Sequence, residues 1–468
     1  MKILKYLSWL LMTLIVFCAC VYCGVSSLWD GVDIALILSH YQLVLSCPLM
    51  PYWKEILLGC VIFLLITFLL CRYWKIAFPL MLIGCITLFF INYHPSPKEE
   101  NVSLFKKEYV IPHVIFPKGQ KKKNIIVISL ESIEDLFTWS DVTGGENLIP
   151  KLTELKKEGI VFDGYYNLQI MVPTIPAFIA MNCGIPRGTS IWKIFANLFK
   201  TKEYGGYPNA FCLSDLLAQY GWETYFIMGA KCTDEGNDKF LERHPMSVSV
   251  GKKELEKLGY LQKDSGYRIP DSELIRFIKE TLNKKRTDAP FFVYFITGNS
   301  HAPKEFVAEA FCEKKYGDGR DAIKCLDKQI FDFVRWCQKQ PWYQNTIIYL
   351  VGDHLSWGLD KTEIFRVKNA KKYPRRQIYN LVLDGSNPLN KGVIKKEFTQ
   401  VDFAPTILES AGFKLLPRKW GIGVSLWSDE PTLVEQLGAK KFEQELEASQ
   451  KDYFDMIYGK QYEVSEDH

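Results

Sequence analysis

"NIIVISLES", residues 124–132, is a continuous apolar run with the length of a β-strand. Two other stretches have the same character, "APFFVYFITGNSH" at 289–301 and "NTIIYLVGDH" at 345–354. Two further runs of this length are mixed in polarity, "GIVFDGYYN" at 159–167 and "GWETYFIMG" at 221–229. A strand that is apolar on both faces belongs in a sheet that is covered on both sides. We therefore predict that these runs form one buried sheet.

Amphipathic patterns lie between these strands and predict helices: "PKLTELKKEG" (150–159), "FCLSDLLAQYG" (211–221) and "DSELIRFIKETLNKK" (271–285). Strands that alternate with amphipathic helices indicate an α/β fold with a mainly parallel sheet. We expect this domain to cover residues 121–430. A polar, proline-bearing linker precedes it at 95–120, and a charged, helix-prone extension follows at 431–468.

Three apolar stretches at the start of the chain, 6–24, 56–71 and 76–91, predict a transmembrane region over residues 1–94. Basic residues precede the first stretch and separate the second from the third: Lys2, Lys5, Arg72 and Lys75. The positive-inside rule then puts the N-terminus in the cytoplasm and everything after Tyr93 outside. The stretch 32–46 carries Asp33 and His40, and we interpret it as an interfacial helix in preference to a fourth span.

Composition limits the classes of partner. The 468 residues carry a net charge of +4, which is too small to argue for nucleic acid. Hydrophobic residues make up 48% of the chain and aromatic residues 14%, as expected for a large core together with membrane segments. The sequence therefore favours a membrane-attached globular domain.

Polar side chains follow the three clearest strands where each strand ends. Glu131 follows the first, His301 follows the second, and Asp353 and His354 follow the third. Ligands of open α/β sheets bind beyond the carboxyl ends of the strands. Each of these residues alone would be ordinary in a loop. Together, on three strands of one sheet, they predict a site for a metal ion or a phosphate group.

"MVPTIPAFIAMNCGIP", residues 171–186, has two interpretations. In the first, Thr174 only caps a helix, with Pro176 in its first turn and Gly184 at its end. In the second, Thr174 is a nucleophile at a helix N-terminus, where free N–H groups and the macrodipole stabilise anions. The sequence of this segment alone leaves both open.

A divalent cation would make the second interpretation chemically reasonable. A threonine hydroxyl is a poor nucleophile by itself, and coordination to a cation lowers its pKa. Glu131, Thr174, Asp353 and His354 together offer three oxygen ligands and one nitrogen ligand. This set suits one ion of Mn²⁺, with Mg²⁺ or Zn²⁺ as alternatives. The expected chemistry is in-line displacement at phosphorus, with a covalent phosphoryl ester on Thr174.

These motifs, in this order, resemble the phosphoglycerol transferase I family. The resemblance covers about residues 120–425 and includes "CGIP" after the threonine, "TGNSHAP", "VGDH" and "TQVDFAPTILESAGF". Proteins of that family are similar to lipoteichoic acid synthases and belong to the alkaline-phosphatase/sulfatase superfamily. The resemblance implies an alkaline-phosphatase-like α/β/α sandwich behind an N-terminal helical transmembrane region.

The resemblance also implies roles for the residues named above. Glu131, Asp353 and His354 would be metal ligands, and Thr174 would be the nucleophile and fourth ligand. His301 would contact the phosphate side, protonating the departing glycerol oxygen or orienting the headgroup. The implied reaction moves glycerol phosphate from phosphatidylglycerol to a glycan or lipid-linked acceptor outside the bacterial cytoplasmic membrane.

The donor headgroup stays open. The family often has a basic residue where this chain has Asn237, and Lys231, Lys239 and Arg243 lie nearby. We expect Asn237 and Lys239 to bind substrate. Transfer of phosphoethanolamine to lipid A or a glycan is one alternative, and a phosphodiesterase or sulfatase-like hydrolase is another. No C-x-P-x-R or S-x-P-x-R motif surrounds Thr174, which disfavours a true sulfatase. A non-enzymatic scaffold is disfavoured because all four ligands are present.

The implied extracytoplasmic location makes disulfides reasonable. Of the thirteen cysteines, six lie beyond residue 95. We expect Cys183 to pair with Cys212 and Cys312 with Cys325, and we leave Cys232 and Cys337 unpaired. Six cysteines permit about fifteen full pairings, so sequence alone does not fix the connectivity. The alternative is that all six are buried thiols.

Overall fold

The computed structural model describes residues 102–187, 206–260, 268–285, 288–301, 308–356 and 375–459. The predicted spans at 6–24, 56–71 and 76–91, and the stretch 32–46, lie outside these residues. Within the described part, no helix is long and apolar enough to cross a bilayer. The described elements from Leu104 onward belong to one compact unit.

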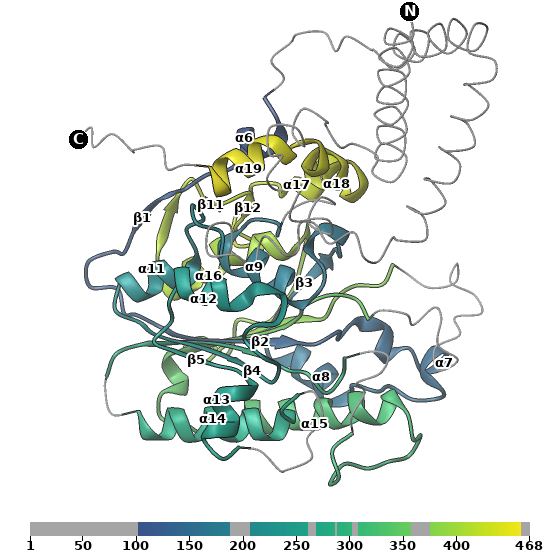
Figure 1. Ribbon diagram of the computed structural model, residues 1–468. Coiled ribbons are helices and arrows are strands. Elements are labelled where there is room, and N and C mark those ends of the chain that lie inside the picture. The colour runs from purple at the N-terminus through teal and green to yellow at the C-terminus, as the bar shows by residue number, and fades with distance from the viewer. Residues whose placement is uncertain are drawn as a thin grey trace, which may run out of the picture. The chain divides into compact units, whose positions relative to one another are not determined.

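An eight-stranded sheet with the order β5-β4-β6-β2-β7-β8-β3-β9 forms the centre of this unit (Figure 1). Its strands in chain order are β2 (Asn124–Leu130), β3 (Ile160–Tyr165), β4 (Glu223–Met228), β5 (Val248–Val250), β6 (Phe291–Ile296), β7 (Thr346–Gly352), β8 (Asn380–Asp384) and β9 (Gly392–Phe398). Strand β8 runs antiparallel to its neighbours β7 and β3, and the other pairs are parallel. The prediction of a mainly parallel sheet is confirmed.

Helices cover both faces of the sheet (Figure 1). One face carries α8 (Pro150–Leu155), α13 (Lys252–Lys257), α14 (Asp271–Lys284) and α15 (Gly319–Gln338). The other face carries α9 (Thr174–Cys183), α11 (Leu213–Gln219), α12 (Asn237–Arg243) and α16 (Phe403–Ala411). All seven residues of β2 are buried, as expected for a strand between two helical layers.

Alternate residues of β2 pack against the helices on opposite faces of the sheet, because successive side chains of a strand point to opposite faces. Ile126, Ile128 and Leu130 join the core that also contains residues of α14 and α15. On the other face, the ring of Phe178 in α9 lies 4.8 Å from that of Phe226 and 4.8 Å from that of Tyr294. Helix α9 is therefore held against the sheet by aromatic packing.

The remaining elements are short: α6 (Leu104–Glu108), α7 (Ser140–Thr143), α17 (Leu433–Leu437), α18 (Ala439–Ala448), α19 (Gln450–Tyr458), β1 (His113–Ile115), β10 (Lys414–Leu416), β11 (Lys419–Trp420) and β12 (Gly423–Val424). Within the predicted linker, α6 buries Phe105, whose ring lies 4.9 Å from that of Tyr453 in α19. Strand β1 pairs with β10. The two ends of the described chain therefore pack together.

Gly184 ends α9 in the left-handed conformation, with φ +66°. A Cβ at this position would lie 2.2 Å from the backbone oxygen of Trp420. Ile422 donates its N–H to the Gly184 carbonyl at 2.8 Å. The glycine of "CGIP" is therefore required by the backbone conformation and by a close approach of two chain segments.

We predict that Gly184→Ala lowers the free energy of unfolding by about 2–4 kcal/mol, because it adds a backbone clash to the cost of a left-handed alanine. Urea unfolding of the purified chain measures this. Gly259 is a matched control, since its φ is +83° and no heavy atom lies within 4 Å of a Cβ added there. Gly259→Ala should cost only about 1 kcal/mol. Equal losses in both variants would contradict the close-approach explanation.

Candidate active site

The structure brings together the four residues that the sequence proposed as metal ligands. Glu131 directly follows β2, and Asp353 and His354 directly follow β7, the strand next to it. One ligand atom from each of these three residues lies within 4.8 Å of the other two. Thr174 begins α9, and its Oγ1 donates a hydrogen bond to Glu131 Oε2 at 2.9 Å. The same Oγ1 is 3.5 Å from His354 Nε2.

The register of the sheet creates this meeting point. Leu130 of β2 is paired directly with Gly352 of β7, so Glu131 and Asp353 leave the sheet side by side. A Cβ at Gly352 would lie 2.2 Å from the backbone oxygen of Ile133. Only glycine fits there, which explains the glycine of the "VGDH" motif.

Ser132 donates hydrogen bonds to the carboxylates of both Glu131 and Asp353. It is one of two non-glycine residues in the described chain with positive φ, at 57°. Its N–H donates to Asp353 Oδ1 at 2.8 Å, and its hydroxyl donates to Glu131 Oε1 at 2.7 Å. The left-handed conformation costs backbone energy, and these two hydrogen bonds offset it.

The hydroxyl of Thr174 does not cap α9. The N-cap residue is Pro173, and no side chain caps this end of the helix. The interpretation of Thr174 as merely a helix cap is therefore wrong. We call the group of Glu131, Asp353 and His354 the ligand cluster. Because the Thr174 Oγ1 donates to the buried carboxylate of Glu131, the hydroxyl is directed into this cluster and away from the backbone of its own helix.

The donor set fits a divalent cation. Asp353 Oδ1 accepts two backbone N–H groups, from Ser132 and His354, whereas the buried Oδ2 has no hydrogen-bond partner. His354 Nδ1 lies 2.9 Å from the carbonyl oxygen of Leu355, which directs Nε2 toward the carboxylates. Nε2 is 3.6 Å from Glu131 Oε1 and 3.5 Å from Asp353 Oδ2. A cation at this point would satisfy the buried Oδ2 atom.

The pKa values of these buried groups show how strongly they interact. Burial and the neighbouring Glu131 charge raise the pKa of Asp353 to about 6. Burial acts to lower the pKa of His354, but the carboxylates of Asp353 and Glu131 outweigh it and raise that pKa. Burial acts to raise the pKa of Glu131, but the charges of His354, His301 and Arg268 outweigh it and lower that pKa. The positive groups nearby therefore stabilise the charged form of Glu131, whereas the Glu131 charge disfavours the charged form of Asp353.

His301 lies on the loop that follows β6, and this loop flanks Glu131. The Glu131 N–H donates to Thr297 Oγ1 at 2.9 Å, and Ser300 Oγ donates to the Glu131 carbonyl at 2.7 Å. The backbone N–H of His301 donates to the carbonyl of Gly298 at 3.2 Å. His301 is half-buried as a residue, and the Nδ1 atom of its ring is shielded from solvent.

Arg268 is a residue of this region that no sequence motif marked. It precedes α14, and a Cβ at Gly298 would lie 3.2 Å from its Cδ and 3.4 Å from its Nη1. The next residue, Ile269, donates its N–H to the carbonyl of Gly229 at the end of β4. Arg268 therefore reaches the site from a segment far away in sequence, and only the sheet order reveals it.

A family model described as sulfatase matches residues 123–413, more than half of the chain. The chain belongs to the sulfatase family. Phosphoglycerol transferase I of Shigella flexneri is 28% identical over 303 residues, which cover 62% of this chain and 38% of that protein. The chain thus spans about two-fifths of the length of the curated relatives it matches.

Two solved structures show the fold of this sulfatase-family chain. A lipoteichoic acid synthase from Listeria monocytogenes matches with a TM-score of 0.55 and 15% identity, covering 72% of this chain and 93% of that one. An alkaline-phosphatase-superfamily protein from Vibrio parahaemolyticus matches with a TM-score of 0.51 and 21% identity, covering 68% and 72%. The predicted alkaline-phosphatase-like architecture of this domain is confirmed.

Asn237 and Lys239 both lie on α12. Asn237 is buried, its Nδ2 lies 3.7 Å from the sulfur of Met228, and its Oδ1 has no hydrogen-bond partner. Lys239 Nζ bonds Glu242 at 2.7 Å and lies 3.6 Å from Asp238. No contact between these residues and the ligand cluster is evident in the described structure, and their binding of a donor stays a prediction.

The segment "TQVDFAPTILESAGF", residues 399–413, is assigned no catalytic role from the sequence, and it is hydrogen-bonded to the backbone of Asp353. Gln400 Nε2 donates to the backbone oxygen of Asp353 at 2.9 Å. The buried carboxylate of Asp402 accepts the N–H groups of Thr399 and Val424. This segment therefore positions the chain at Asp353, a candidate metal ligand.

Both predicted disulfides are present in this sulfatase-family domain. Cys183–Cys212 joins the end of α9 to the residue before α11, and Cys312–Cys325 joins a loop to α15. Among the described residues, the free cysteines are Cys232 and Cys337. Helix α9 is thus fixed at the end opposite Thr174.

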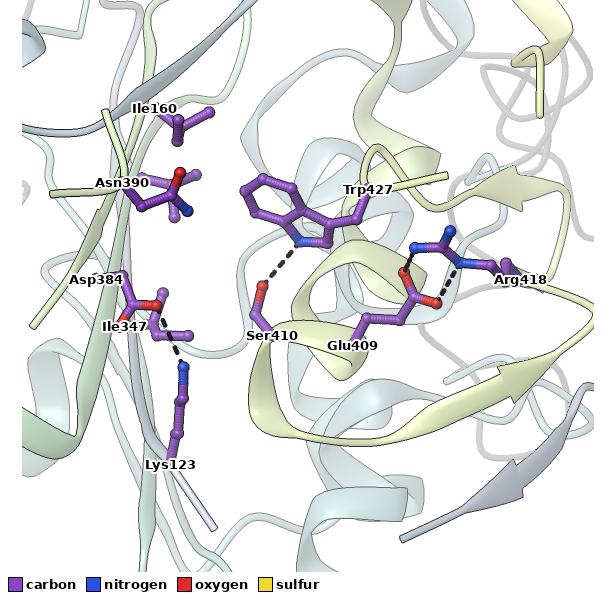
Figure 2. A pocket seen from close by; sticks show the side chains of 10 residues that line it. Lys123, Ile160, Ile347, Asp384, Asn390, Glu409, Ser410, Arg418 and Trp427 are labelled. Carbon is purple, nitrogen blue, oxygen red and sulfur yellow. Dashed lines mark hydrogen bonds and ion pairs between the residues drawn. The ribbon is translucent and has the colours of Figure 1, made fainter. Parts of the chain in front are cut away.

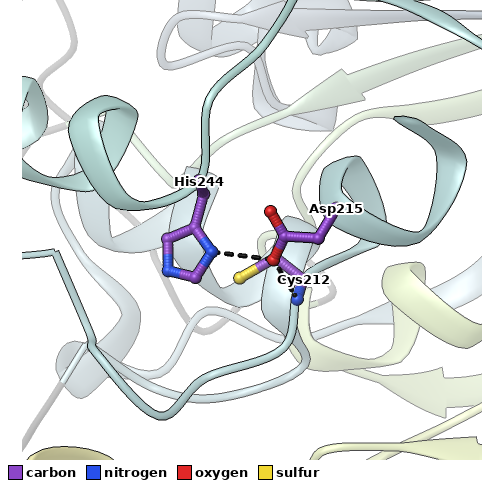
Figure 3. A group of neighbouring side chains, drawn as sticks. All are labelled: Cys212, Asp215 and His244. Atoms are coloured by element: carbon purple, nitrogen blue, oxygen red, sulfur yellow. Dashed lines mark hydrogen bonds and ion pairs between the residues drawn. The ribbon is translucent and has the colours of Figure 1, made fainter. Parts of the chain in front are cut away.

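A second cluster, Cys212, Asp215 and His244, has the residue types of a metal site (Figure 3). The Cys212 sulfur is already bonded to Cys183, so it offers no thiolate. His244 Nδ1 lies 2.7 Å from Asp215 Oδ2, and its Nε2 lies 2.9 Å from the carbonyl of Gly206. The histidine therefore links two chain segments structurally.

A pocket of about 360 Å³ lies at the opposite, amino-terminal edge of β2 and β7 (Figure 2). Its charged side chains are paired with one another: Lys123 with Asp384 at 3.2 Å, and Arg418 with Glu409 at 2.7 Å. Trp427 Nε1 donates to Ser410 Oγ at 2.9 Å. This pocket is separate from the ligand cluster, which lies at the carboxyl edge.

We predict that Asp353→Asn weakens Mn²⁺ binding by roughly 100-fold or more, because it removes a charged ligand atom from the buried cluster. Isothermal titration calorimetry of the purified chain measures this. Asp384→Asn, at the other edge of the sheet, is the matched control and should bind Mn²⁺ as the wild type does. Wild-type affinity in Asp353→Asn would show that the metal assignment is wrong.

Proposed function

We propose that this chain is a metal-dependent transferase that moves glycerol phosphate from phosphatidylglycerol to an envelope glycan or lipid-linked acceptor. The observation that carries the proposal is the position of the Thr174 hydroxyl. It occupies the first residue of a ten-residue helix and lies 2.9 Å from Glu131 within the cluster of ligand groups. The similarity to phosphoglycerol transferase I supports the class of group transferred.

The side chains divide the work as follows. A bound divalent ion, held by Glu131, Asp353, His354 and Thr174, would lower the pKa of the hydroxyl and withdraw charge from the phosphate. The Thr174 proton points at Glu131 Oε2, which accepts it in the hydrogen bond. The N–H groups in the first turn of α9 stabilise the phosphate oxygens, as at other helix N-termini.

The proposed reaction has two displacements at phosphorus. First, Thr174 Oγ1 bonds to phosphorus while the bond to the glycerol oxygen of the departing diacylglycerol breaks, and His301 donates a proton to that oxygen. Second, an acceptor hydroxyl bonds to the same phosphorus and gives its proton to His301, while the bond to Thr174 breaks and the Thr174 oxygen regains its proton from Glu131. Glycerol phosphate is thereby moved from donor to acceptor with no net gain or loss of atoms.

The proposed location is the outer side of a bacterial cytoplasmic membrane. The apolar stretches at 6–24, 56–71 and 76–91 would anchor the chain, and the domain would meet headgroups at the bilayer surface. The two disulfides support an oxidising compartment outside the cytoplasm.

Two other reactions share this site chemistry. A phosphoethanolamine headgroup would present the same phosphodiester, and water in place of the acceptor would make the enzyme a phosphodiesterase. Sulfate ester hydrolysis is disfavoured because no cysteine or serine precursor of formylglycine occupies the position of Thr174. The mass of the group bound to Thr174 separates the two headgroups.

We predict that Thr174→Ala lowers turnover by about 1,000-fold or more and abolishes the covalent adduct, because the nucleophile is removed. Mass spectrometry of the intact chain, mixed with Mn²⁺ and isotope-labelled phosphatidylglycerol, measures the adduct. Thr174→Ser keeps a hydroxyl and should retain it. Wild-type transfer by Thr174→Ala would refute the mechanism, and an ethanolamine-containing adduct from mixed lipids would reassign the donor.

We also predict that a reporter enzyme fused after His468 is active only outside the cytoplasm, because three spans place the C-terminal part there. Measuring reporter activity in intact and permeabilised cells tests this. Cytoplasmic activity would indicate that the stretch 32–46 spans the membrane as well.

A further inference from the structure

The two carboxylates of the ligand cluster would neutralise a bound divalent ion, so the negative charge of the donor phosphate needs other positive groups. Two carboxylates, Glu131 and Asp353, neutralise the charge of a divalent ion. A phosphodiester carries a further negative charge, and charge develops on it as a new bond to phosphorus forms. Positive side chains on the substrate side are therefore required, in addition to the metal ion.

Arg268 lies near the carboxyl end of β4 and can supply a positive charge to the donor phosphate. The hydrogen bond from Ile269 to Gly229 holds its segment at the carboxyl end of β4, and β4 neighbours β6. Its side chain lies against Gly298, in the loop that follows β6. Arg268 is half-buried as a residue, and the Nε atom of its guanidinium is shielded from solvent.

The loop beneath Arg268 is tied directly to a metal ligand. Thr297 and Ser300 are hydrogen-bonded to the backbone N–H and carbonyl of Glu131. Arg268 thus lies against the first five residues after β6, which begin at Thr297 beside Glu131 and include His301. Arg268 lies against the same loop that carries His301, and this loop borders Glu131.

Hydrogen bonds to side chains of α14 and of the segment before α15 hold this loop in place. Asp271 accepts the N–H groups of Gly298 at 2.7 Å and Asn299 at 3.1 Å. The Asn299 side chain donates to Glu309 at 2.8 Å, and Gln329 donates to the same oxygen at 2.7 Å. Both oxygens of Asp271 are therefore engaged by the loop backbone, and the loop is held rigidly where Arg268 lies against it.

We propose that Arg268 is a donor-binding residue whose guanidinium, together with His301, holds the phosphate of the headgroup opposite Thr174. The proposal rests on the proposed function and adds the residue that recognises the phosphate. A planar guanidinium can donate to two phosphate oxygens at once, which a lysine ammonium does less specifically. Lys239, the cation that the sequence indicated, is instead engaged by Glu242.

The test compares Arg268→Gln with the wild type, using the full chain in detergent with Mn²⁺. We expect the dissociation constant for glycerol phosphate, and the KM for phosphatidylglycerol, each to rise about 10- to 100-fold. The thermal unfolding midpoint should stay close to that of the wild type. Unchanged values for both ligands would overturn the proposal, and so would an unchanged KM for phosphatidylglycerol in a chain whose wild type forms the adduct.

Arg276→Gln is the matched control. Arg276 lies on α14, is 47% exposed and pairs with Glu273 and Glu280 away from the loop. It should change neither constant, and an equal loss in this variant would overturn the proposal. Arg268→Lys keeps the charge and should give an intermediate loss, which serves as the test if Arg268→Gln does not fold.

Gly298→Ala provides an independent variant that leaves the arginine in place. The added methyl group would lie 3.2 Å from Arg268 Cδ and displace the guanidinium slightly. We expect a severalfold rise in the dissociation constant for glycerol phosphate. If the wild type forms no adduct on Thr174 but Arg268→Gln still loses glycerol phosphate binding, the transfer reaction fails and the phosphate contact stands.

Discussion

The parallel pairing of β2 with β7 brings two carboxylates to one buried point, and the rest of the site depends on this pairing. Leu130 lies opposite Gly352, so Glu131 and Asp353 emerge together from the carboxyl edge of the sheet. A shift of one residue in this register would point one of the two carboxylates into the opposite helical layer.

Burying two acids is costly, and the surrounding chain offsets the cost in several ways. Backbone N–H groups of Ser132 and His354 donate to Asp353, and the Ser132 and Thr174 hydroxyls donate to Glu131. The remaining bare oxygen, Asp353 Oδ2, is the position that a cation would fill. The hydroxyl of Thr174 is therefore oriented by the same charge that would bind the metal.

Elements outside the central strands contribute rigidity. The Cys183–Cys212 disulfide holds the far end of α9, and aromatic rings hold its middle against the sheet. The loop after β6 is fixed by hydrogen bonds to Glu131 on one side and to Asp271 on the other. A hydroxyl that must approach phosphorus in line benefits from such fixed surroundings, because small displacements cost rate.

The sequence alone determined five of the eight strands of the sheet, the fold class and the four candidate ligands, and it missed the strands β5, β8 and β9. Long apolar runs that end in Glu131, Asp353 and His354 are local features, and the order of parallel strands makes their carboxyl ends meet. Local sequence could not decide whether Thr174 caps its helix or faces the cluster, because both arrangements use the same residues. Only the three-dimensional contact with Glu131 decided this.

Arg268 shows the other limit of sequence reasoning. It carries no motif and lies more than thirty residues before His301, so its approach to the loop depends on β4 and β6 being neighbours. The contacts of Gln400 with Asp353 and of Gly352 with Ile133 also depend on the tertiary structure, although both residues lie in motifs that the sequence shows. The sequence determined which groups could do chemistry. The tertiary structure decided which of them meet, because contacts between distant segments are set by strand order and register and not by local pattern.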